Sequence, residues 1–221
     1  MKTKLITIAM MVALLLAAIT RGQAQEYDGP CLPPTHGLDD HQSAFCGSTE
    51  TQTIALSAGT NWFSTNLDIT LDDLKAALVA ALPGTTITIK SQNSGQTTWN
   101  GRMWVGTLRT MDVSQMYMIS VANACEITLE GLPIDPAEHP VTISNGPNWI
   151  GFPLGATMTI TNAFAGFAAS GDIVKSDGGG QATWNGRMWT GQLKNLESGK
   201  GYIYESAATE SRTFTFPTNA K

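Results

Sequence analysis

Charged residues are scarce in this chain: Asp, Glu, Lys and Arg make up 14% of its 221 residues, against roughly 25% in an average soluble domain. The formal net charge is −5, with 13 Lys and Arg against 18 Asp and Glu. Disorder needs high net charge and low hydrophobicity, whereas 42% of these residues are apolar, so we expect a folded chain. The acidic balance offers no basic surface for nucleic acid or for anionic lipid, and we predict neither as a partner.

Histidine is almost missing, and the patterns of common catalytic sites are absent. The chain has three histidines and no nucleophile-elbow, Walker, Rossmann, HExxH or EF-hand motif. His139 stands alone beside a proline, which is typical of a solvated side chain. Asp68, Asp72 and Asp73 cluster, but at a predicted helix start, where acids are expected for electrostatic reasons. We therefore predict no enzyme, no catalytic residue and no cofactor, with an exported hydrolase as a distant alternative.

Long apolar runs are also missing, except at the N-terminus. Residues 5–19 are mostly apolar and follow two lysines, and Gly22 and Ala24 then supply small residues for a cleavage site. This is the pattern of a secretory signal peptide, and the run is shorter than the ~20 residues of a membrane span. We predict a signal peptide over residues 1–24 with Gln25 as the mature N-terminus. We expect a secreted or cell-surface protein without membrane insertion after cleavage, the alternative being an uncleaved anchor.

Cysteine is limited to three residues. Cys31 and Cys46 enclose 14 residues in a polar leader, residues 25–50. Exported chains with little apolar material commonly use disulfides, so we predict a Cys31–Cys46 bridge and expect Cys125 to be a free core residue. A bridge from Cys125 to one of the N-terminal cysteines is the alternative.

The leader also contains two of the three histidines. Cys31, His36, His41 and Cys46 follow one another at equal steps of five. Thiolate and imidazole are zinc ligands, but zinc sites usually place paired ligands about two to four residues apart. We therefore predict no metal site.

The body of the chain is an internal repeat. The heptapeptide Thr-Trp-Asn-Gly-Arg-Met-Trp occupies residues 98–104 and recurs at 183–189, a shift of 85. Upstream the shift becomes 87, which aligns Trp62 with Trp149, so the six tryptophans fall at equivalent places, three in each copy. Self-similarity at a fixed shift indicates units of the same fold.

The repeat sets the domain organisation. A proline-punctuated joint, residues 132–136, separates the two copies. We divide the chain into a signal peptide (1–24), a polar leader (25–50), repeat one (51–132) and repeat two (138–217).

Each repeat contains one helical pattern and several strand patterns. In repeat one, leucines recur at helical spacing over residues 71–82, Thr70 and Asp73 occupy capping-box positions, and a Pro-Gly pair ends the pattern. Repeat two has a weaker equivalent over residues 161–169. The main strand patterns cover residues 85–89, 96–99, 103–108, 116–121 and 126–129, and then 173–174, 181–184, 188–193, 201–205 and 213–216. We predict an α+β fold, mainly antiparallel β, built from two tandem homologous repeats with several short strands and one helix each.

Asn-Gly at the centre of each heptapeptide is a strong hairpin signal, because type I′ turns need positive φ at both central residues. We predict that the two tryptophans of each heptapeptide lie on opposite strands of one hairpin. A two-residue turn would pair Trp99 with Arg102 and place Trp104 on the same face as Arg102.

These hairpins are candidate binding platforms. Tryptophan stacks on sugar rings or on partner side chains, arginine supplies a planar set of donors, and asparagine adds amide hydrogen bonds. The candidate ligand-binding residues are Trp99, Asn100, Arg102, Trp104, Trp184, Asn185, Arg187 and Trp189. The alternative is structural: the tryptophans pack across the hairpin, Met103 fills the core and the arginine covers a tryptophan. Solvent exposure separates the two interpretations.

Four segments of repeat two follow a recognisable order: Asn148-Trp149-Ile150, Ile173-Val174-Lys175-Ser176, residues 184–191, and Leu196-Glu197-Ser198-Gly199-Lys200-Gly201-Tyr202. This pattern resembles a repeat module of secreted and surface accessory proteins of Gram-negative gut anaerobes. Repeat one departs from it at residues 111–117, which lack both glycines. The resemblance implies an accessory or interaction role at the exterior of a Gram-negative bacterium.

Together these observations predict a secreted or cell-surface recognition module for adhesion or protein–protein interaction, including assembly into a surface polymer. Its partner would be a protein or a glycan at the cell exterior. The alternative is a carbohydrate-binding protein that uses the Trp-Asn-Gly-Arg-Met-Trp hairpins.

Overall fold

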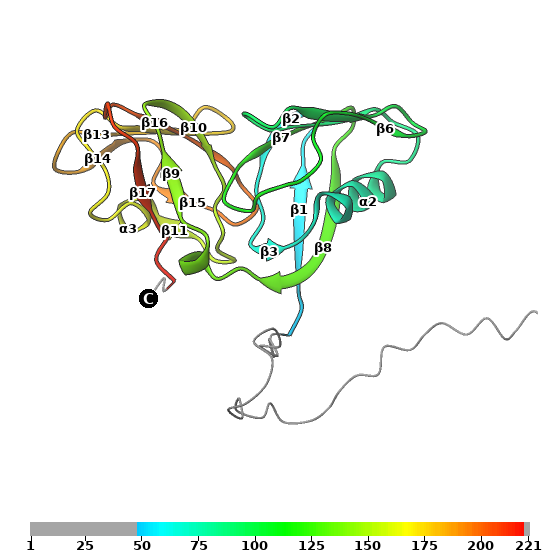
Figure 1. Ribbon diagram of the computed structural model, residues 1–221, viewed down its shortest axis with the longest axis horizontal. Helices are drawn as coiled ribbons and strands as arrows, with labels where there is room; N and C mark the ends of the chain where they lie inside the picture. The colour runs from blue at the N-terminus through cyan, green and yellow to red at the C-terminus, as the bar shows by residue number, and fades with distance from the viewer. Residues whose placement is uncertain (1–47, 219–221) are drawn as a thin grey trace, which may run out of the picture. The chain divides into compact units, whose positions relative to one another are not determined.

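The computed structural model describes residues 48–218, which form mainly antiparallel strands with few helical residues (Figure 1). This confirms the predicted β-rich α+β class. The signal peptide, nearly all of the polar leader, and the predicted Cys31–Cys46 bridge lie outside the described residues. Within residues 48–218, no helix has the length and apolar character needed to cross a membrane.

The strands of repeat one form two sheets. In chain order the elements are β1 (Glu50–Leu56), β2 (Gly59–Phe63), β3 (Leu67–Asp68), α2 (Leu71–Ala81), β4 (Ile87–Lys90), β5 (Gln96–Trp99), β6 (Trp104–Gly106), β7 (Tyr117–Val121) and β8 (Cys125–Pro133). A five-stranded sheet has the order β2-β7-β4-β5-β6, and a three-stranded sheet has the order β1-β8-β3. The core between these sheets and α2 is mostly aliphatic, with Leu74, Ile87 and Ile119 fully buried beside the aromatic Phe63 and Tyr117.

Repeat two follows a short 3-10 turn, η1 (Pro136–Glu138). Its elements are β9 (Val141–Ile143), β10 (Gly146–Ile150), β11 (Met158–Thr159), α3 (Ile160–Ala163), β12 (Ile173–Ser176), β13 (Gln181–Trp184), β14 (Trp189–Gly191), β15 (Asn195–Leu196), β16 (Tyr202–Ser206) and β17 (Arg212–Phe214). The five-stranded sheet is β10-β16-β12-β13-β14, with the pairs β17-β9 and β11-β15 beside it. Under the sequence alignment, both five-stranded sheets have their strands in the same order, and no sheet mixes strands of the two repeats.

The predicted helix of repeat one forms as α2. Asp73 N donates to Thr70 Oγ1 at 3.2 Å, and Thr70 N donates to the Asp73 carboxylate at 2.8 Å, which completes the capping box. The prediction for repeat two was wrong in extent, because α3 ends after four residues instead of covering 161–169. Gly166 has φ of 72°, which a right-handed helix does not allow.

The edge strands β6 and β14 are shorter than the predicted segments 103–108 and 188–193, because each ends in a bulge. Thr107 N and Leu108 N both donate to Gln96 O, at 2.8 and 3.1 Å, and two donors on one carbonyl interrupt the ladder. Gly106 has φ of 151°, and a Cβ there would lie 2.2 Å from Gln96 O. The bulge therefore requires glycine and leaves an edge of only three residues.

The two repeats contact each other through equivalent residues. Trp62 N donates to Asp177 Oδ2 at 3.0 Å, and Trp149 N donates to Gln92 Oε1 at 2.7 Å. Trp62 corresponds to Trp149 under the shift of 87, and Gln92 corresponds to Asp177 under the shift of 85. The contact therefore has approximate two-fold symmetry, in which the same surface is used on both sides.

Backbone contacts follow the same relation. Gly201 N donates to Trp62 O at 2.9 Å, and Met116 N donates to Trp149 O at 3.4 Å. Two isolated bridges repeat it again: Phe63 with Lys200, and Ile150 with Gln115. Strands β2 and β10 are the edge strands of their five-stranded sheets. The segment before β16 covers β2, and the segment before β7 covers β10, so neither edge is left open.

Candidate functional site

The tip of each Trp-Asn-Gly-Arg-Met-Trp hairpin is a four-residue loop. In loop 100–103, Asn100 Oδ1 accepts hydrogen bonds from Arg102 N at 3.0 Å and Met103 N at 2.9 Å, and Asn100 N donates to Met103 O at 3.2 Å. The same bonds with the same lengths join Asn185, Arg187 and Met188. The predicted two-residue turn was wrong, because the asparagine side chain organises a wider loop.

The wider loop changes the strand register. Trp99 pairs directly with Trp104, not with Arg102, and Trp184 pairs with Trp189. The prediction that the two tryptophans lie on opposite strands is confirmed. Their ring centroids are 5.7 Å apart in repeat one and 5.5 Å apart in repeat two, with tilted planes.

The tryptophans are partly structural. Trp99, Trp104 and Trp184 are half-buried against the cores of their own repeats, and Trp189 is 8% exposed. Trp99 Nε1 is buried without a hydrogen-bond partner. The tilted, half-buried rings therefore leave no pair of open faces on which a sugar could stack.

The outermost side chains of the hairpins are the arginines and methionines. Arg102 and Arg187 are exposed, and Met103 and Met188 are each 57% exposed. The structural alternative expected Met103 to fill the core, and the exposed side chain shows that it does not. Neither arginine covers a tryptophan, since the cation–π contacts among residues 48–218 involve Lys75 and Arg212.

The two hairpins differ in what covers their second tryptophan. In repeat one, the Lys75 ammonium lies 5.9 Å from the centre of the Trp104 ring. In repeat two, Phe164 lies 5.8 Å from Trp189, measured between ring centroids. The phenyl ring excludes more water than the lysine chain, which explains why Trp189 is more deeply buried than Trp104.

The acidic cluster of repeat one has the helix-start role that the sequence indicates. Asp73 caps α2, and the hydrogen bonds from Thr70 lower the pKa of Asp73. Asp72 pairs with Lys75 at 3.0 Å. These contacts account for both carboxylates at the helix terminus, and Asp68 is exposed in β3.

Cys125 and His139 lie apart from the predicted binding hairpins. Cys125 is a half-buried free thiol at the start of β8, and burial raises its pKa, which disfavours the reactive thiolate. His139 is half-buried and follows η1. Within the described part of the chain, no group of three His, Cys, Asp or Glu residues could hold a metal ion; His36 and His41 lie outside it.

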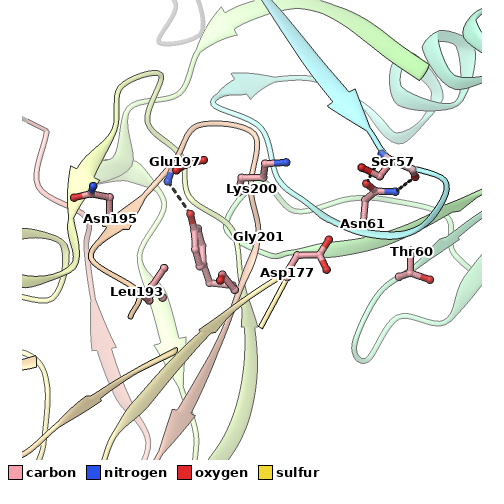
Figure 2. Close-up of a pocket in the computed structure, with 12 residues that line it drawn as sticks. Ser57, Thr60, Asn61, Asp177, Leu193, Asn195, Glu197, Lys200 and Gly201 are labelled. Atoms are coloured by element: carbon pink, nitrogen blue, oxygen red, sulfur yellow. Dashed lines mark hydrogen bonds between the residues drawn. The ribbon is translucent and has the colours of Figure 1, made fainter. Parts of the chain in front are cut away.

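A cavity of about 410 Å³ lies where the two repeats meet (Figure 2). Its walls come from the β1–β2 turn, the β12–β13 turn and the segment before β16. The lining residues are Ser57, Thr60, Asn61, Ser176, Asp177, Gly178, Leu193, Asn195, Glu197, Lys200, Gly201 and Tyr202. The tryptophan hairpins do not contribute to it.

Several groups in this cavity are held in place. The Asn61 side chain accepts from Ser57 N and donates to Ser57 O, both at 2.8 Å. The Tyr202 hydroxyl accepts from Glu197 N at 2.7 Å, and burial raises the pKa of Tyr202 to about 12. By contrast, the Glu197 carboxylate and the Lys200 ammonium form no hydrogen bond or ion pair with residues 48–218, and both side chains are exposed.

The sequence motifs did not indicate Asp177, Glu197 or Lys200. A comparison of the two repeats could have singled these positions out, because repeat one has different side chains there. The aligned residues are Gln92, Asp112 and Gln115. The β1–β2 turn reaches this cavity only because the two repeats contact each other, and no local sequence pattern predicts that contact.

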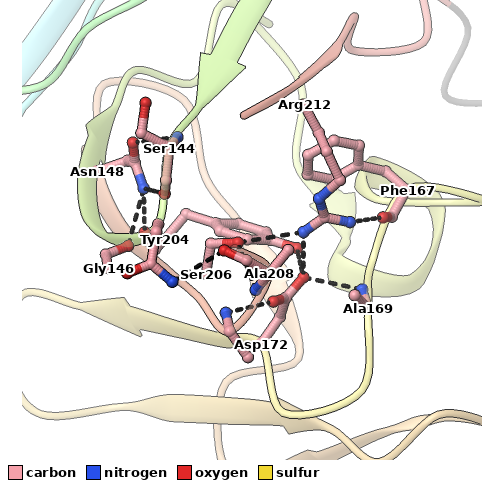
Figure 3. Close-up of polar contacts among 12 residues, drawn as sticks. Ser144, Gly146, Asn148, Phe167, Ala169, Asp172, Tyr204, Ser206, Ala208 and Arg212 are labelled. Atoms are coloured by element: carbon pink, nitrogen blue, oxygen red, sulfur yellow. Dashed lines mark hydrogen bonds and ion pairs between the residues drawn. The ribbon is translucent and has the colours of Figure 1, made fainter. Parts of the chain in front are cut away.

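A second polar cluster is centred on Asp172 (Figure 3). Its carboxylate is fully buried and accepts from the Tyr204 hydroxyl at 2.5 Å, from Arg212 Nη2 at 2.8 Å, and from two backbone amides. Burial alone would raise the pKa of Asp172, but these hydrogen bonds outweigh it and lower the pKa. Burial and the neighbouring Asp172 carboxylate raise the pKa of Tyr204.

This cluster fastens the C-terminal strand. Arg212, in β17, also donates to Phe167 O at 2.6 Å and lies 4.5 Å from the centre of the Phe167 ring. Every oxygen of Asp172 is used by a partner from the same repeat, so the cluster is a structural tie.

Protein-family models, curated proteins and solved structures contain no match to this chain. The interpretation of its surfaces therefore rests on the residues themselves. Two exposed features combine side chains that a partner could recognise: the paired hairpin tips, and the polar cavity between the repeats.

Proposed function

We propose that this protein is a recognition module of the cell exterior that binds a protein partner through its two hairpin tips. The observation that carries the proposal is the equal exposure, 57%, of Met103 and Met188 at equivalent loops, each next to an exposed arginine. Val105 is the other large apolar side chain that is exposed among residues 48–218. Met and Arg are enriched in protein interfaces, and flexible methionine adapts to irregular surfaces.

A protein partner suits these tips better than a sugar does. Sugar recognition at the hairpins would use tryptophan faces, and these are tilted and half-buried. At each hairpin tip the groups exposed to solvent are a methionine, an arginine and a backbone loop whose conformation is fixed by asparagine. The pre-formed loop lowers the entropy cost of binding.

The tips also give the chain two equivalent contacts. If both engage one partner assembly, avidity raises the apparent affinity without any new type of contact. The signal-peptide pattern and the resemblance to exported modules support a location outside the cell, and we propose no catalytic role.

The test is binding of the mature chain, residues 25–221, to an array of extracellular proteins and an array of glycans. Replacing both methionines by serine should weaken binding to any protein hit by about tenfold or more, and so should Arg102→Ala combined with Arg187→Ala. Melting temperatures should stay within about 2 °C, because these side chains are exposed.

Val105→Thr is the matched control, because it gives repeat one the residue that repeat two has at position 190. It should leave binding unchanged. Unchanged binding to an identified partner in both folded double variants would refute a role for the tips.

A further inference from the structure

The cavity between the repeats has polar walls from both of them. The β1–β2 turn contributes Ser57, the start of β2 contributes Thr60, the β12–β13 turn contributes Asp177, and the segment before β16 contributes Glu197 and Lys200. Figure 2 shows Asp177 and Lys200 facing the segment that carries Ser57 and Asn61. The volume of about 410 Å³ falls in the range of small-molecule sites, roughly 300–1,000 Å³.

Three features of the cavity are prepared for a ligand. Asp177 is positioned by the Trp62 N–H at 3.0 Å, which leaves its other oxygen free to accept. Asn61 and Tyr202 are fixed by the bonds described above. A binding site whose groups are already ordered loses less entropy when a ligand enters.

The strongest observation is a difference between the repeats. In repeat one, the Asp112 carboxylate accepts from Ser114 N at 2.9 Å, from the Ser114 hydroxyl at 2.7 Å and from Gln115 Nε2 at 3.1 Å. The aligned residues of repeat two are Glu197, Gly199 and Lys200. Gly199 has no hydroxyl, and the Glu197 side chain has no partner among residues 48–218. The loop of repeat one therefore supplies hydrogen-bond donors to the Asp112 carboxylate. The equivalent loop of repeat two supplies none to the Glu197 carboxylate, which lies at the cavity.

The chemistry of the walls defines a ligand class. Carboxylates accept hydrogen bonds from hydroxyl groups, lysine donates to hydroxyl oxygens, and Asn195 can do both. The charged groups are two carboxylates and one ammonium, which disfavours an anion, and Leu193 is the main apolar side chain, which disfavours an apolar molecule. A neutral molecule rich in hydroxyl groups can form these hydrogen bonds, carries no negative charge and is not apolar.

We propose that this cavity binds a small neutral saccharide, with Asp177 and Glu197 accepting from sugar hydroxyls and Lys200 donating to a sugar oxygen. The site is separate from the hairpin tips, and it uses none of their residues. It therefore places sugar recognition between the repeats instead of on the tryptophans.

The test is NMR titration of the ¹⁵N-labelled mature chain with glucose, galactose, mannose, N-acetylglucosamine, maltose and lactose. At least one sugar should shift the Trp62 amide, because its N–H is bound to Asp177. The Trp149 amide is the internal control, because its acceptor is Gln92 on the other side of the approximate two-fold axis, and it should not move.

Variants locate the site. Glu197→Gln and Lys200→Met should each weaken binding of that sugar by about tenfold, since a hydrogen bond to a charged group is lost. Lys194→Met, an exposed lysine of the same segment that does not line the cavity, should have no effect, nor should Arg102→Ala with Arg187→Ala. The proposal is overturned if no sugar in the panel shifts Trp62, if the cavity variants bind as wild type, or if glucuronic acid binds more tightly than glucose.

Discussion

At the residue scale, the two repeats differ most sharply in one buried trio. Repeat two has Asp172, Tyr204 and Arg212 in contact with one another. At the equivalent positions repeat one has apolar side chains: Ile87 and Ile119 under the shift of 85, and Cys125, which pairs with Leu56 as Arg212 pairs with Ile143. Buried ion pairs and apolar replacements of similar volume often give similar stability. Repeats of similar architecture therefore accommodate both solutions, and all three positions differ together.

Removing one member should be far more costly. Arg212→Met leaves the fully buried Asp172 carboxylate without its cation, so we expect a loss of about 3–5 kcal/mol in the free energy of unfolding. Urea denaturation measures it. Lys175→Met is the control, because the Lys175–Glu205 pair is about 40% exposed on both sides and should contribute about 1 kcal/mol or less. Equal losses in the two variants would contradict the structural role of the Asp172 cluster.

The same cluster predicts an acid dependence of stability. The pKa of Asp172 is lower in the folded than in the unfolded chain, so the unfolded chain binds the proton more readily. The resulting stabilisation is complete above the unfolded pKa of about 3.9 and is lost as the pH falls through the folded pKa. When the pH is lowered from about 5 to about 3, the free energy of unfolding should therefore decrease less in Asp172→Asn than in the wild type. Parallel losses in urea titrations at the two pH values would argue against it.

At the element scale, α2 and α3 show what local sequence can and cannot predict. The leucine spacing and the Thr70–Asp73 capping box were sufficient for α2. The segment of α3 has a cap as well, since Asn162 N donates to Thr159 Oγ1 at 3.3 Å. Its aromatic side chains, however, turn into a cluster around Phe164, and Gly166 takes a positive φ. Tertiary packing overrides a weak helical pattern here.

The two caps give a matched prediction. Thr70→Ala removes an N-cap and half of a capping box from an eleven-residue helix, so it should cost about 0.5–2 kcal/mol. Thr159→Ala removes one longer bond from a four-residue helix and should cost less. Chemical denaturation of both variants provides the comparison, and a larger loss for Thr159→Ala would contradict the expected order of the two caps.

The hairpins were predictable in existence but not in register. Asn-Gly indicated the turn, and the two tryptophans do lie on opposite strands. The loop length depends on the Asn100 side chain, which accepts two backbone amides, and the sequence pattern allows both loop lengths. The cavity was not predictable at all, because its walls come from segments more than 100 residues apart in the chain.

At the scale of the whole molecule, the approximate two-fold axis passes between Met116 and Gly201. These residues are equivalent under the shift of 85, and a Cβ at Gly201 would lie 2.1 Å from Met116 Cγ. A side chain at position 201 would therefore overlap the Met116 side chain where it now lies. The contact therefore cannot be fully symmetric, and repeat two carries the glycine.

This asymmetry can be tested by exchange. Gly201→Met should be strongly destabilising because two side chains would occupy one space, and Met116→Gly should create a cavity costing about 2–5 kcal/mol. The double variant exchanges the two sides of the axis and should recover much of the combined loss. A double-mutant cycle of unfolding free energies measures the recovery. Additive losses would show that the two positions do not share one space.

The coverage of β2 by repeat two has a consequence for the order in which the chain folds. Repeat one contains all the strands of its own sheets and is complete at Pro133, whereas the backbone that covers β2 ends at Gly201, about 70 residues later. Until repeat two has folded against repeat one, this edge stays open. During that interval the edge can pair with a neighbouring chain. Repeat two therefore protects repeat one from this pairing, in addition to carrying its own surfaces.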